Sequence, residues 1–147
     1  MQDIGALGEQ LIVRWLELHN CKILQQNWRC CWGEIDIIAQ DGKDKTILFV
    51  EVKTRNKTNW DEDGLLAINS TKQEKIINTA SLFLAKYSQL ADFPCRFDAA
   101  LISYIKTKQE AEVKKIEQLQ DFDLGMPVEI ASYQLTIKKY IQSAFEA

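Results

Sequence analysis

Two acidic residues and one lysine near the middle of the chain have types and spacing that suit chemistry on a charged substrate. Asp36 lies in the apolar run 34–39, and Glu51 and Lys53 lie in a second apolar run, 47–53. Because side chains alternate along a strand, Glu51 and Lys53 project from one face. If the two runs pair symmetrically, Asp36 lies opposite Glu51, with Cβ atoms about 4.5–5.5 Å apart. Two carboxylates this close repel each other unless a cation or a proton lies between them.

The chemistry that these groups favour is metal-assisted hydrolysis of a phosphodiester. Oxygen ligands without His or Cys suit Mg²⁺ or Mn²⁺ better than zinc. The cation would lower the pKa of bound water and neutralise charge on the scissile phosphate, while Lys53 would orient the nucleophile and stabilise the transition state. The alternative is a structural salt-bridge cluster in which Glu34 pairs with Lys53, an arrangement that usually contributes little stability.

A hairpin must bring these residues together. The runs 34–39 and 47–53 have the composition of strands, and the turn-rich segment 41–45 separates them. A symmetric loop gives a register with one wholly apolar face, made of the pairs Ile35–Val52, Ile37–Val50 and Ala39–Leu48. A shift of one residue would destroy both this face and the polar pairs, so the register is strongly specified.

Two helices and three further strands are predicted around this hairpin. Residues 3–19 have the 3.6-residue apolar stripe of an amphipathic helix. Ser70 followed by Gln73 forms a capping box that starts a second helix, whose apolar stripe ends at Tyr87. The strands are predicted at 21–28, 96–105 and 135–141, whereas residues 106–132 are polar and mixed, with no predicted element.

One acidic residue, Glu9, lies beside the apolar stripe of the first helix. It projects on the same side as Ile12, Val13 and Leu16, where a purely solubilising carboxylate is unexpected. The alternative interpretation is a carboxylate at the edge of the stripe that reaches water. Helix periodicity alone leaves both interpretations open.

Length, composition and charge exclude several classes of protein. At 147 residues, with 46% hydrophobic and 27% charged side chains, the chain fits one globular domain. The net charge of −3 argues against indiscriminate nucleic-acid binding through bulk charge but is compatible with a local basic groove. No apolar run reaches the roughly 18 residues of a membrane span, and Met1-Gln2-Asp3 lacks the basic start of a signal peptide, so we expect a cytoplasmic protein.

The cysteines and the histidine exclude other chemistries. Four cysteines without a C-x-x-C pair predict reduced thiols rather than a disulfide framework or a zinc site. The only histidine, His19, falls near the end of a predicted helix. This excludes an HExxH metalloprotease and disfavours a Ser-His-Asp site. The acidic residues of the hairpin are therefore the most informative feature of the chain.

Several motifs together resemble a known family. The segments Gly33–Ala39, Phe49–Arg55 and Arg96–Asp98 resemble the UPF0102 (YraN) family of small bacterial proteins, and further matches are Gly5, Gly8, Glu9, Asn27, Lys72, Ala144 and Phe145. That family is grouped with the PD-(D/E)XK nuclease superfamily and is similar in its core to archaeal Holliday-junction resolvases. The resemblance covers nearly all of the chain except residues 106–132, which we interpret as an insertion within a single domain, 1–147.

The resemblance implies a fold and a set of site residues. The fold is an α/β restriction-endonuclease-like domain with three layers, α/β/α, and a mixed central sheet. Asp36 and Glu51 correspond to metal ligands for Mg²⁺ or Mn²⁺, together with the backbone carbonyl of Val52. Lys53 corresponds to the catalytic lysine. Glu9 corresponds to the helix acid of the superfamily, which makes it a further catalytic residue and candidate ligand.

Four cations and one aromatic residue are candidate contacts to DNA. Arg55, Lys57, Lys72 and Lys75 are candidates for phosphate contacts, and Trp60 is a candidate base-stacking residue. Lys72 and Lys75 fall in the first turn of the second helix, where cations oppose the helix dipole unless a phosphate binds there.

Three functions fit the sequence. The first is a nuclease that acts on DNA, with branched or single-stranded structures as substrates; junction resolution would require a two-fold homodimer. The second is a non-catalytic module that binds nucleic acid. The third is a protein-interaction domain whose polar face is structural and whose segment 106–132 docks a partner. The joint presence of Glu9, Asp36, Glu51 and Lys53 favours the first over the third.

Overall fold

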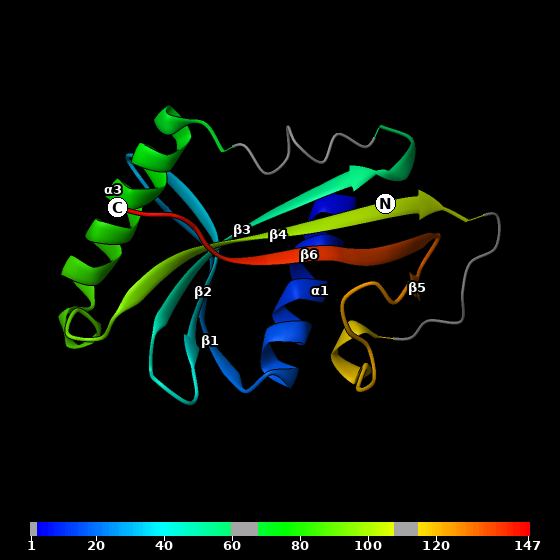
Figure 1. The fold of residues 1–147 in the computed structure, drawn as a ribbon, viewed down its shortest axis with the longest axis horizontal. Coiled ribbons are helices and arrows are strands. Elements are labelled where there is room, and N and C mark those ends of the chain that lie inside the picture. Colours follow the sequence, from blue (N-terminus) through cyan, green and yellow to red (C-terminus); the bar gives the residue numbers. More distant parts are fainter. Residues whose placement is uncertain (1–2, 60–67, 108–114) are drawn as a thin grey trace.

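The computed structural model describes residues 3–59, 68–107 and 115–147 and shows an α/β protein built on one mixed sheet (Figure 1). The elements in chain order are α1 (Ile4–Leu18), β1 (Cys21–Cys30), β2 (Gly33–Asp41), β3 (Ile47–Asn56), η1 (Lys57–Asn59), α3 (Ser70–Lys86), η2 (Ser88–Leu90), β4 (Cys95–Lys106), η3 (Ile116–Gln118), β5 (Val128–Ile130) and β6 (Tyr133–Phe145). No helix among the described residues is both long enough and apolar enough to span a membrane.

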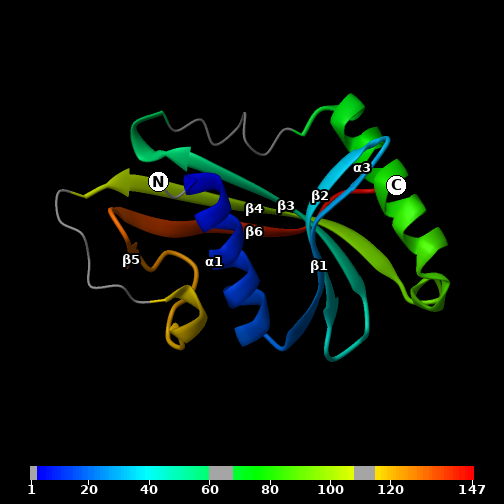
Figure 2. The ribbon, with the colours of Figure 1, turned by 180° about the vertical axis from the view of Figure 1, so that it is seen from behind.

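The sheet has six strands in the order β1-β2-β3-β4-β6-β5. Every neighbouring pair is antiparallel except β3 and β4, which run parallel. Parallel neighbours need a crossover connection, and α3 lies in the segment that joins these two strands. Figure 2 shows the same order from behind, with α1 and α3 toward different ends of the long strands. The predicted α/β class with a mixed sheet is confirmed.

The two helices pack on opposite faces of the sheet, and alternation along β3 shows this directly. Phe49 belongs to the apolar cluster that includes Phe83 of α3, whereas its neighbour Val50 belongs to the cluster that includes Leu11 of α1. Successive side chains of a strand point to opposite faces, so each face of β3 faces one helix. The sheet thus lies between two apolar cores, one under each helix.

The predicted hairpin register is confirmed in its inner part and fails at its outer end. Ile37 pairs with Val50 and Ala39 with Leu48, as the apolar alternation predicted. The ladder between β2 and β3 stops there, and Ile35 lies in the α3-side cluster rather than on the same side as Ile37. The wholly apolar face therefore excludes Ile35, because β2 turns out of register with β3 at Asp36.

The start of α3 also differs from the predicted capping box. Asn69, not Ser70, is the N-cap: its Oδ1 accepts a hydrogen bond from the Lys72 backbone N–H at 2.8 Å. Gln73 donates from its side chain to the Ile68 carbonyl at 2.6 Å. Asn and Ser cap helices about equally well, so two adjacent capping residues leave the start of a helix ambiguous by one position.

Residues 115–130 add elements that the sequence did not indicate. The three-residue strand β5 pairs with β6, and the short helix η3 packs on the α1 side of the sheet. The apolar cluster around α1 gains four residues from this part of the chain: Ile116, Phe122, Val128 and Ile130. The Trp15 indole of α1 donates to the Asp123 carboxylate at 2.9 Å. This part of the chain therefore covers one end of α1.

Candidate active site

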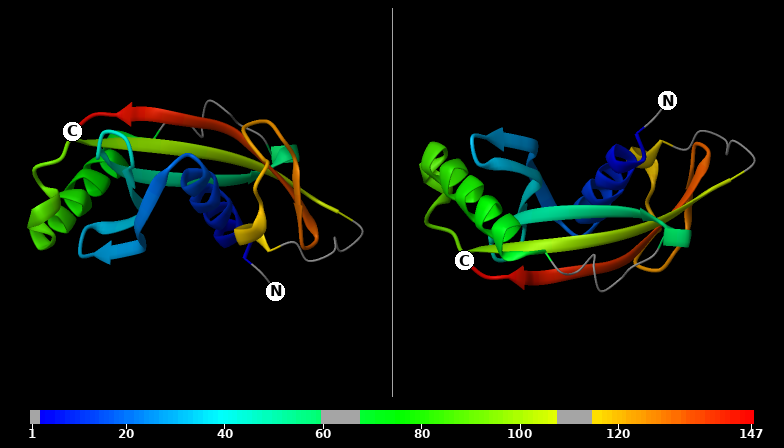
Figure 3. Two further views of the ribbon diagram at one scale, coloured as in Figure 1. Left: turned by 90° about the horizontal axis from the view of Figure 1, so that it is seen from below. Right: turned by 90° about the horizontal axis from the view of Figure 1, so that it is seen from above.

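The candidate site lies where β2 separates from β3. The β2–β3 ladder ends at Ile37–Val50, although β3 stays paired with β4 as far as Asn56. Figure 3 shows the β1–β2 hairpin bending away from the long strands β3 and β4. We call the opening between β2 and β3 beyond Ile37 and Val50 the sheet fork. An opening in a sheet lets side chains from both faces meet, which a continuous ladder would prevent.

Asp36 lies on the β2 side of the fork, and its carboxylate forms a hydrogen bond across the fork to β3. Its Oδ2 accepts from the Val52 backbone N–H at 2.8 Å, the bond that a main-chain carbonyl of β2 would accept if the ladder continued. Since the N–H and C=O of one residue in a strand point the same way, the Val52 carbonyl is also directed into the fork. The carboxylate of Asp36 and this carbonyl thus face the same opening.

Glu51 projects toward α3 and binds two ammonium groups. Its Oε1 lies 3.2 Å from Lys53 Nζ and 2.9 Å from Lys72 Nζ. The Glu51 side chain is only 11% exposed, so these ion pairs are shielded from bulk water. Lys53 lies on the same side as Glu51, as strand alternation requires. The predicted structural pair Glu34–Lys53 does not form: Lys53 pairs with Glu51, and Glu34 Oε2 lies 3.3 Å from Arg29 Nε instead.

Glu9 reaches the fork from α1, on the other face of the sheet. The close approach of α1 to β3 at Gly8 places it there, because a Cβ at Gly8 would overlap the Thr54 hydroxyl. Asn27 of β1 links the acids: with its amide nitrogen turned toward them, it donates to Glu34 Oε1 at 2.7 Å and to Glu9 Oε2 at 3.2 Å. Glu9 is half-buried and lies beside other carboxylates, so it is not a carboxylate that only reaches water.

Burial and neighbouring carboxylates raise the pKa values of two acids in this cluster, Asp36 and Glu9. Burial and then the charge of Glu51 raise the pKa of Asp36 from 3.8 to about 7, although the Val52 N–H opposes this. Burial, followed by the charge of Glu34, raises the pKa of Glu9, against the Asn27 hydrogen bond. Burial and the neighbouring Lys72 lower the pKa of Lys53, despite its ion pair with Glu51. Carboxyls that resist ionisation beside a crowded pair of amines are typical of functional sites.

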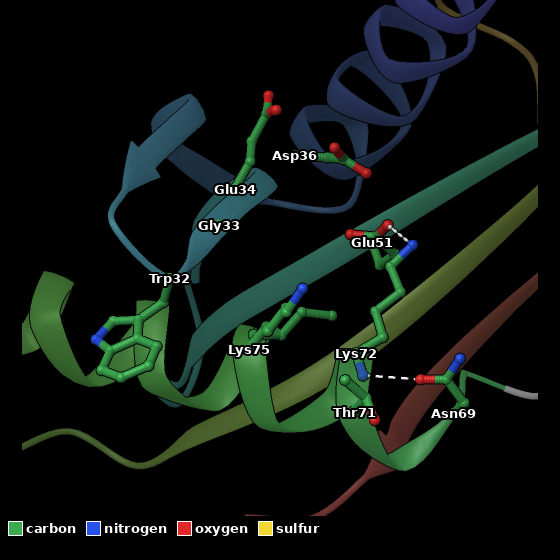
Figure 4. A pocket seen from close by; sticks show the side chains of 10 residues that line it. Trp32, Gly33, Glu34, Asp36, Glu51, Asn69, Thr71, Lys72 and Lys75 are labelled. Carbon is green, nitrogen blue, oxygen red and sulfur yellow. Dashed lines mark hydrogen bonds and ion pairs between the residues drawn. The ribbon is translucent and has the colours of Figure 1, made fainter.

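A cavity of about 670 Å³ opens onto these groups (Figure 4). Its lining includes Asp36 and Glu51 from the sheet, Lys72 and Lys75 from α3, and Trp32 from the β1–β2 turn. Figure 4 shows the two carboxylates at one end of this cavity and the Trp32 indole at the other. A polyanion could therefore reach the acidic residues past two cations.

The remaining predicted contacts are placed differently. Lys72 and Lys75 line the cavity, whereas Arg55 and Lys57 are exposed and do not belong to its lining. The Arg55 guanidinium donates to the Thr54 carbonyl at 3.1 Å. The prediction for Trp60 lies outside the described residues. The structure thus brings Glu9, Asp36, Glu51, Lys53, Lys72 and Lys75 to one region, whereas Arg55 and Lys57 are exposed outside the cavity lining.

Two residues of the site had no functional interpretation in the sequence. Asn27 bridges two acids from a left-handed backbone conformation, with φ 51°, a conformation that Asn tolerates better than most residues. Trp32 lines the cavity from a two-residue turn. β1 is rich in polar residues, so Asn27 gave no separate signal, and a lone aromatic beside a turn is only a weak signal for Trp32.

The donor set fits a hard divalent cation. Among the described residues, no three His, Cys, Asp or Glu side chains have the spacing of a metal site. Mg²⁺, however, keeps several waters and is commonly bound by only one or two carboxylates. Asp36 and Glu51 with the Val52 carbonyl provide such a set, and the charge of Glu51, which after burial raises the pKa of Asp36, is the part of that shift that a cation between the two carboxylates would relieve. The Lys72 ammonium on Glu51 already supplies part of that charge.

Comparison with known proteins identifies relatives along most of the chain. The model of the family described as "Uncharacterised protein family UPF0102" matches residues 8–102. A UPF0102 protein of Synechocystis is 45% identical over 148 residues, covering 99% of both chains. A UPF0102 protein of Trichodesmium erythraeum is 44% identical over 159 residues, covering 97% of this chain and 88% of the relative.

Proposed function

The chain belongs to the UPF0102 family, and we propose that it is a metal-dependent nuclease that hydrolyses DNA phosphodiester bonds. The observation that carries this proposal is that Asp36 and Glu51 line an open cavity that also holds two lysines of α3, with the Lys53 ammonium 3.2 Å from Glu51 Oε1. Carboxylates for a cation, an ammonium beside them and a cationic approach are the groups that phosphodiester hydrolysis requires.

In this proposal Asp36 and Glu51, with the Val52 carbonyl, hold Mg²⁺ or Mn²⁺. When bound, the cation supplies an activated water and charge neutralisation at the scissile phosphate. Asp36 must be ionised to bind it, and the charge of a bound cation would lower the pKa that burial has raised. Glu9 sits on the other side of the fork and is placed to hold a water or to complete the ligand set.

Lys53 acts beside the acids rather than as a distant anchor. Its Nζ lies 3.2 Å from Glu51 Oε1, so it stays within reach of any group that Glu51 holds. There it orients the nucleophile and stabilises negative charge on the phosphate in the transition state. Lys72 and Lys75 bind the flanking phosphates as the strand enters the cavity.

Cleavage assays with matched variants test this proposal. Purified protein is incubated with plasmid, linear, single-stranded and four-way-junction DNA in Mg²⁺, in Mn²⁺ and in chelator. Asp36→Ala and Lys53→Ala are run in parallel, with Glu129→Gln as a control carboxylate exposed on β5. We expect metal-dependent cleavage by the wild type and by Glu129→Gln, and losses of at least a hundredfold in the two site variants. Cleavage that persists undiminished in both site variants would refute the proposed site.

A second candidate function is a module that binds DNA without cutting it. The observation in its favour is the Lys72 ammonium, which lies 2.9 Å from Glu51 Oε1 and already neutralises the carboxylate that a metal ion would bind. The same experiment separates the two functions, because a wild type that retards junctions or single strands yet cuts none of them is a binding module. Resolution of four-way junctions would in addition require a homodimer, which sedimentation of the junction complex measures.

A further inference from the structure

The exposed Trp32 side chain is the feature of the cavity that metal chemistry leaves unexplained. Trp32 is 49% exposed, whereas Trp15 is 9% exposed and Trp28 packs edge-on against Phe83 with ring centroids 5.4 Å apart. A large apolar ring that is half exposed at the rim of a charged cavity is stabilised when a flat partner covers it, because apolar surface is then removed from water.

The backbone holds this indole in place. Cys31 and Trp32 form the two-residue turn between β1 and β2, and Gly33 follows with φ 149°, a conformation that other residues rarely adopt. The backbone N–H of Trp32 donates to Cys30 Sγ at 3.3 Å, and that thiol contacts the Thr79 hydroxyl of α3 at 3.5 Å. The turn that carries the indole is therefore fastened to α3, so the backbone of Trp32 loses little freedom when a ligand stacks on the ring.

The cavity connects this ring to the acidic residues through cations. Figure 4 shows Trp32 at one end, Asp36 and Glu51 at the other and Lys75 between them, while the Lys72 ammonium lies at the far end, on Glu51. Trp32 precedes Asp36 by four positions, about 13 Å if the chain is extended. Successive phosphates of a stacked strand are only about 3.4 Å apart along its axis, so the stacked base belongs to a nucleotide beside the attacked phosphate.

We propose that Trp32 stacks on an unpaired nucleobase of a strand whose phosphates follow Lys75 and Lys72 toward Asp36. Inside a duplex both faces of each base are covered by neighbouring base pairs, and only the edges are accessible. An unpaired base offers its face to an aromatic ring regardless of sequence. The substrate class is thus nucleic acid that is single-stranded or locally unpaired a few nucleotides from the reacting phosphate. This inference rests on the proposed function for the direction of the strand.

Binding without turnover tests the stacking. Labelled oligonucleotides of about 15 nucleotides, single-stranded or in a duplex, are titrated in chelator and followed by fluorescence anisotropy. We expect Trp32→Ala to weaken single-strand binding about tenfold and duplex binding less than about twofold, with Trp32→Phe close to wild type. Met126→Ala is the matched control, since Met126 is 48% exposed and does not line the cavity.

Equal weakening for single strands and duplex, or no weakening by Trp32→Ala, would overturn the stacking. Thermal melting of each variant checks that the turn substitution leaves the fold intact. Metal-dependent cleavage with no effect of Trp32 on binding defeats this inference alone. Single-strand binding that depends on Trp32, without cleavage by the wild type, defeats the nuclease and leaves the stacking site.

Discussion

Asp36→Asn is predicted to stabilise the protein while it removes the candidate metal ligand. In the folded chain the pKa of Asp36 is raised from 3.8 to about 7, so the folded state binds a proton that the unfolded state has released between these two values. The free energy of unfolding therefore falls as pH rises through this window. Asn has no proton to lose and can keep the hydrogen bond from the Val52 N–H, so the variant escapes this loss.

The size of the effect follows from the shift. A rise of about three pKa units corresponds to about 4 kcal/mol, since one unit is 1.36 kcal/mol. The carboxyl borders a cavity open to water, which screens part of this, so we expect Asp36→Asn to gain about 2–4 kcal/mol at about pH 8. The gain should shrink as pH falls and vanish below about pH 4, where Asp36 is protonated in both states.

Urea denaturation in chelator at several pH values between about 4 and 8 measures this difference. Asp98→Asn is a matched control with the opposite sign. Asp98 is fully buried and accepts bonds from the Arg96 Nε, the Tyr140 hydroxyl at 2.6 Å and the Ser143 N–H at 3.0 Å. Its neutralisation leaves Arg96 without its charged partner and should cost about 3–5 kcal/mol. The reasoning about the acidic cluster fails if Asp36→Asn is no more stable than the wild type at about pH 8, or if its gain is the same at every pH.

Two further predictions concern residues around the fork. Lys72→Ala removes an ammonium from Glu51 Oε1 and should increase Mn²⁺ affinity about threefold or more. Lys75→Ala removes an exposed cation of the same helix and should have a smaller effect. Calorimetric titration compares the two variants, and equal affinities would show that Lys72 does not compete with the ion. Gly8→Ala drives a methyl group into the Thr54 hydroxyl and should destabilise the fold by about 1–3 kcal/mol in thermal melts. In Gly5→Ala the new Cβ would meet only the Asp3 side chain, with Oδ1 at 3.4 Å, so this variant should be at least as stable as the wild type. Matching melting temperatures for the two variants would contradict the close packing of α1 on β3.

The central hairpin was predictable because its register is fixed by local alternation. Ile37, Ala39, Leu48 and Val50 are apolar at every second position, and only one register buries all of them. Ile35 continues the same alternation, yet it turns to the other face because β2 leaves β3 at Asp36. That separation depends on Asp36 binding the Val52 N–H and on contacts with both helices, which no local pattern contains.

The predicted site residues follow the same division. Glu51 and Lys53 share a face because they are two positions apart on one strand, which is a local property. Lys72 meets Glu51 from a helix that lies well after it in the chain, and the helix signal places it in a first turn without showing what it faces. β5 spans only Val128–Ile130 and is held by β6, so its own sequence carried too little signal to predict it.

The most direct test of the metal site at the sheet fork is a calorimetric titration of Mn²⁺ at about pH 8, where Asp36 is mostly ionised. The titration compares the wild type with Asp36→Asn, Glu51→Gln and the control Glu129→Gln. We expect one ion to bind per chain in the wild type and in Glu129→Gln, and this binding to be lost in both Asp36→Asn and Glu51→Gln. Binding of the same strength in all four proteins would contradict the metal site.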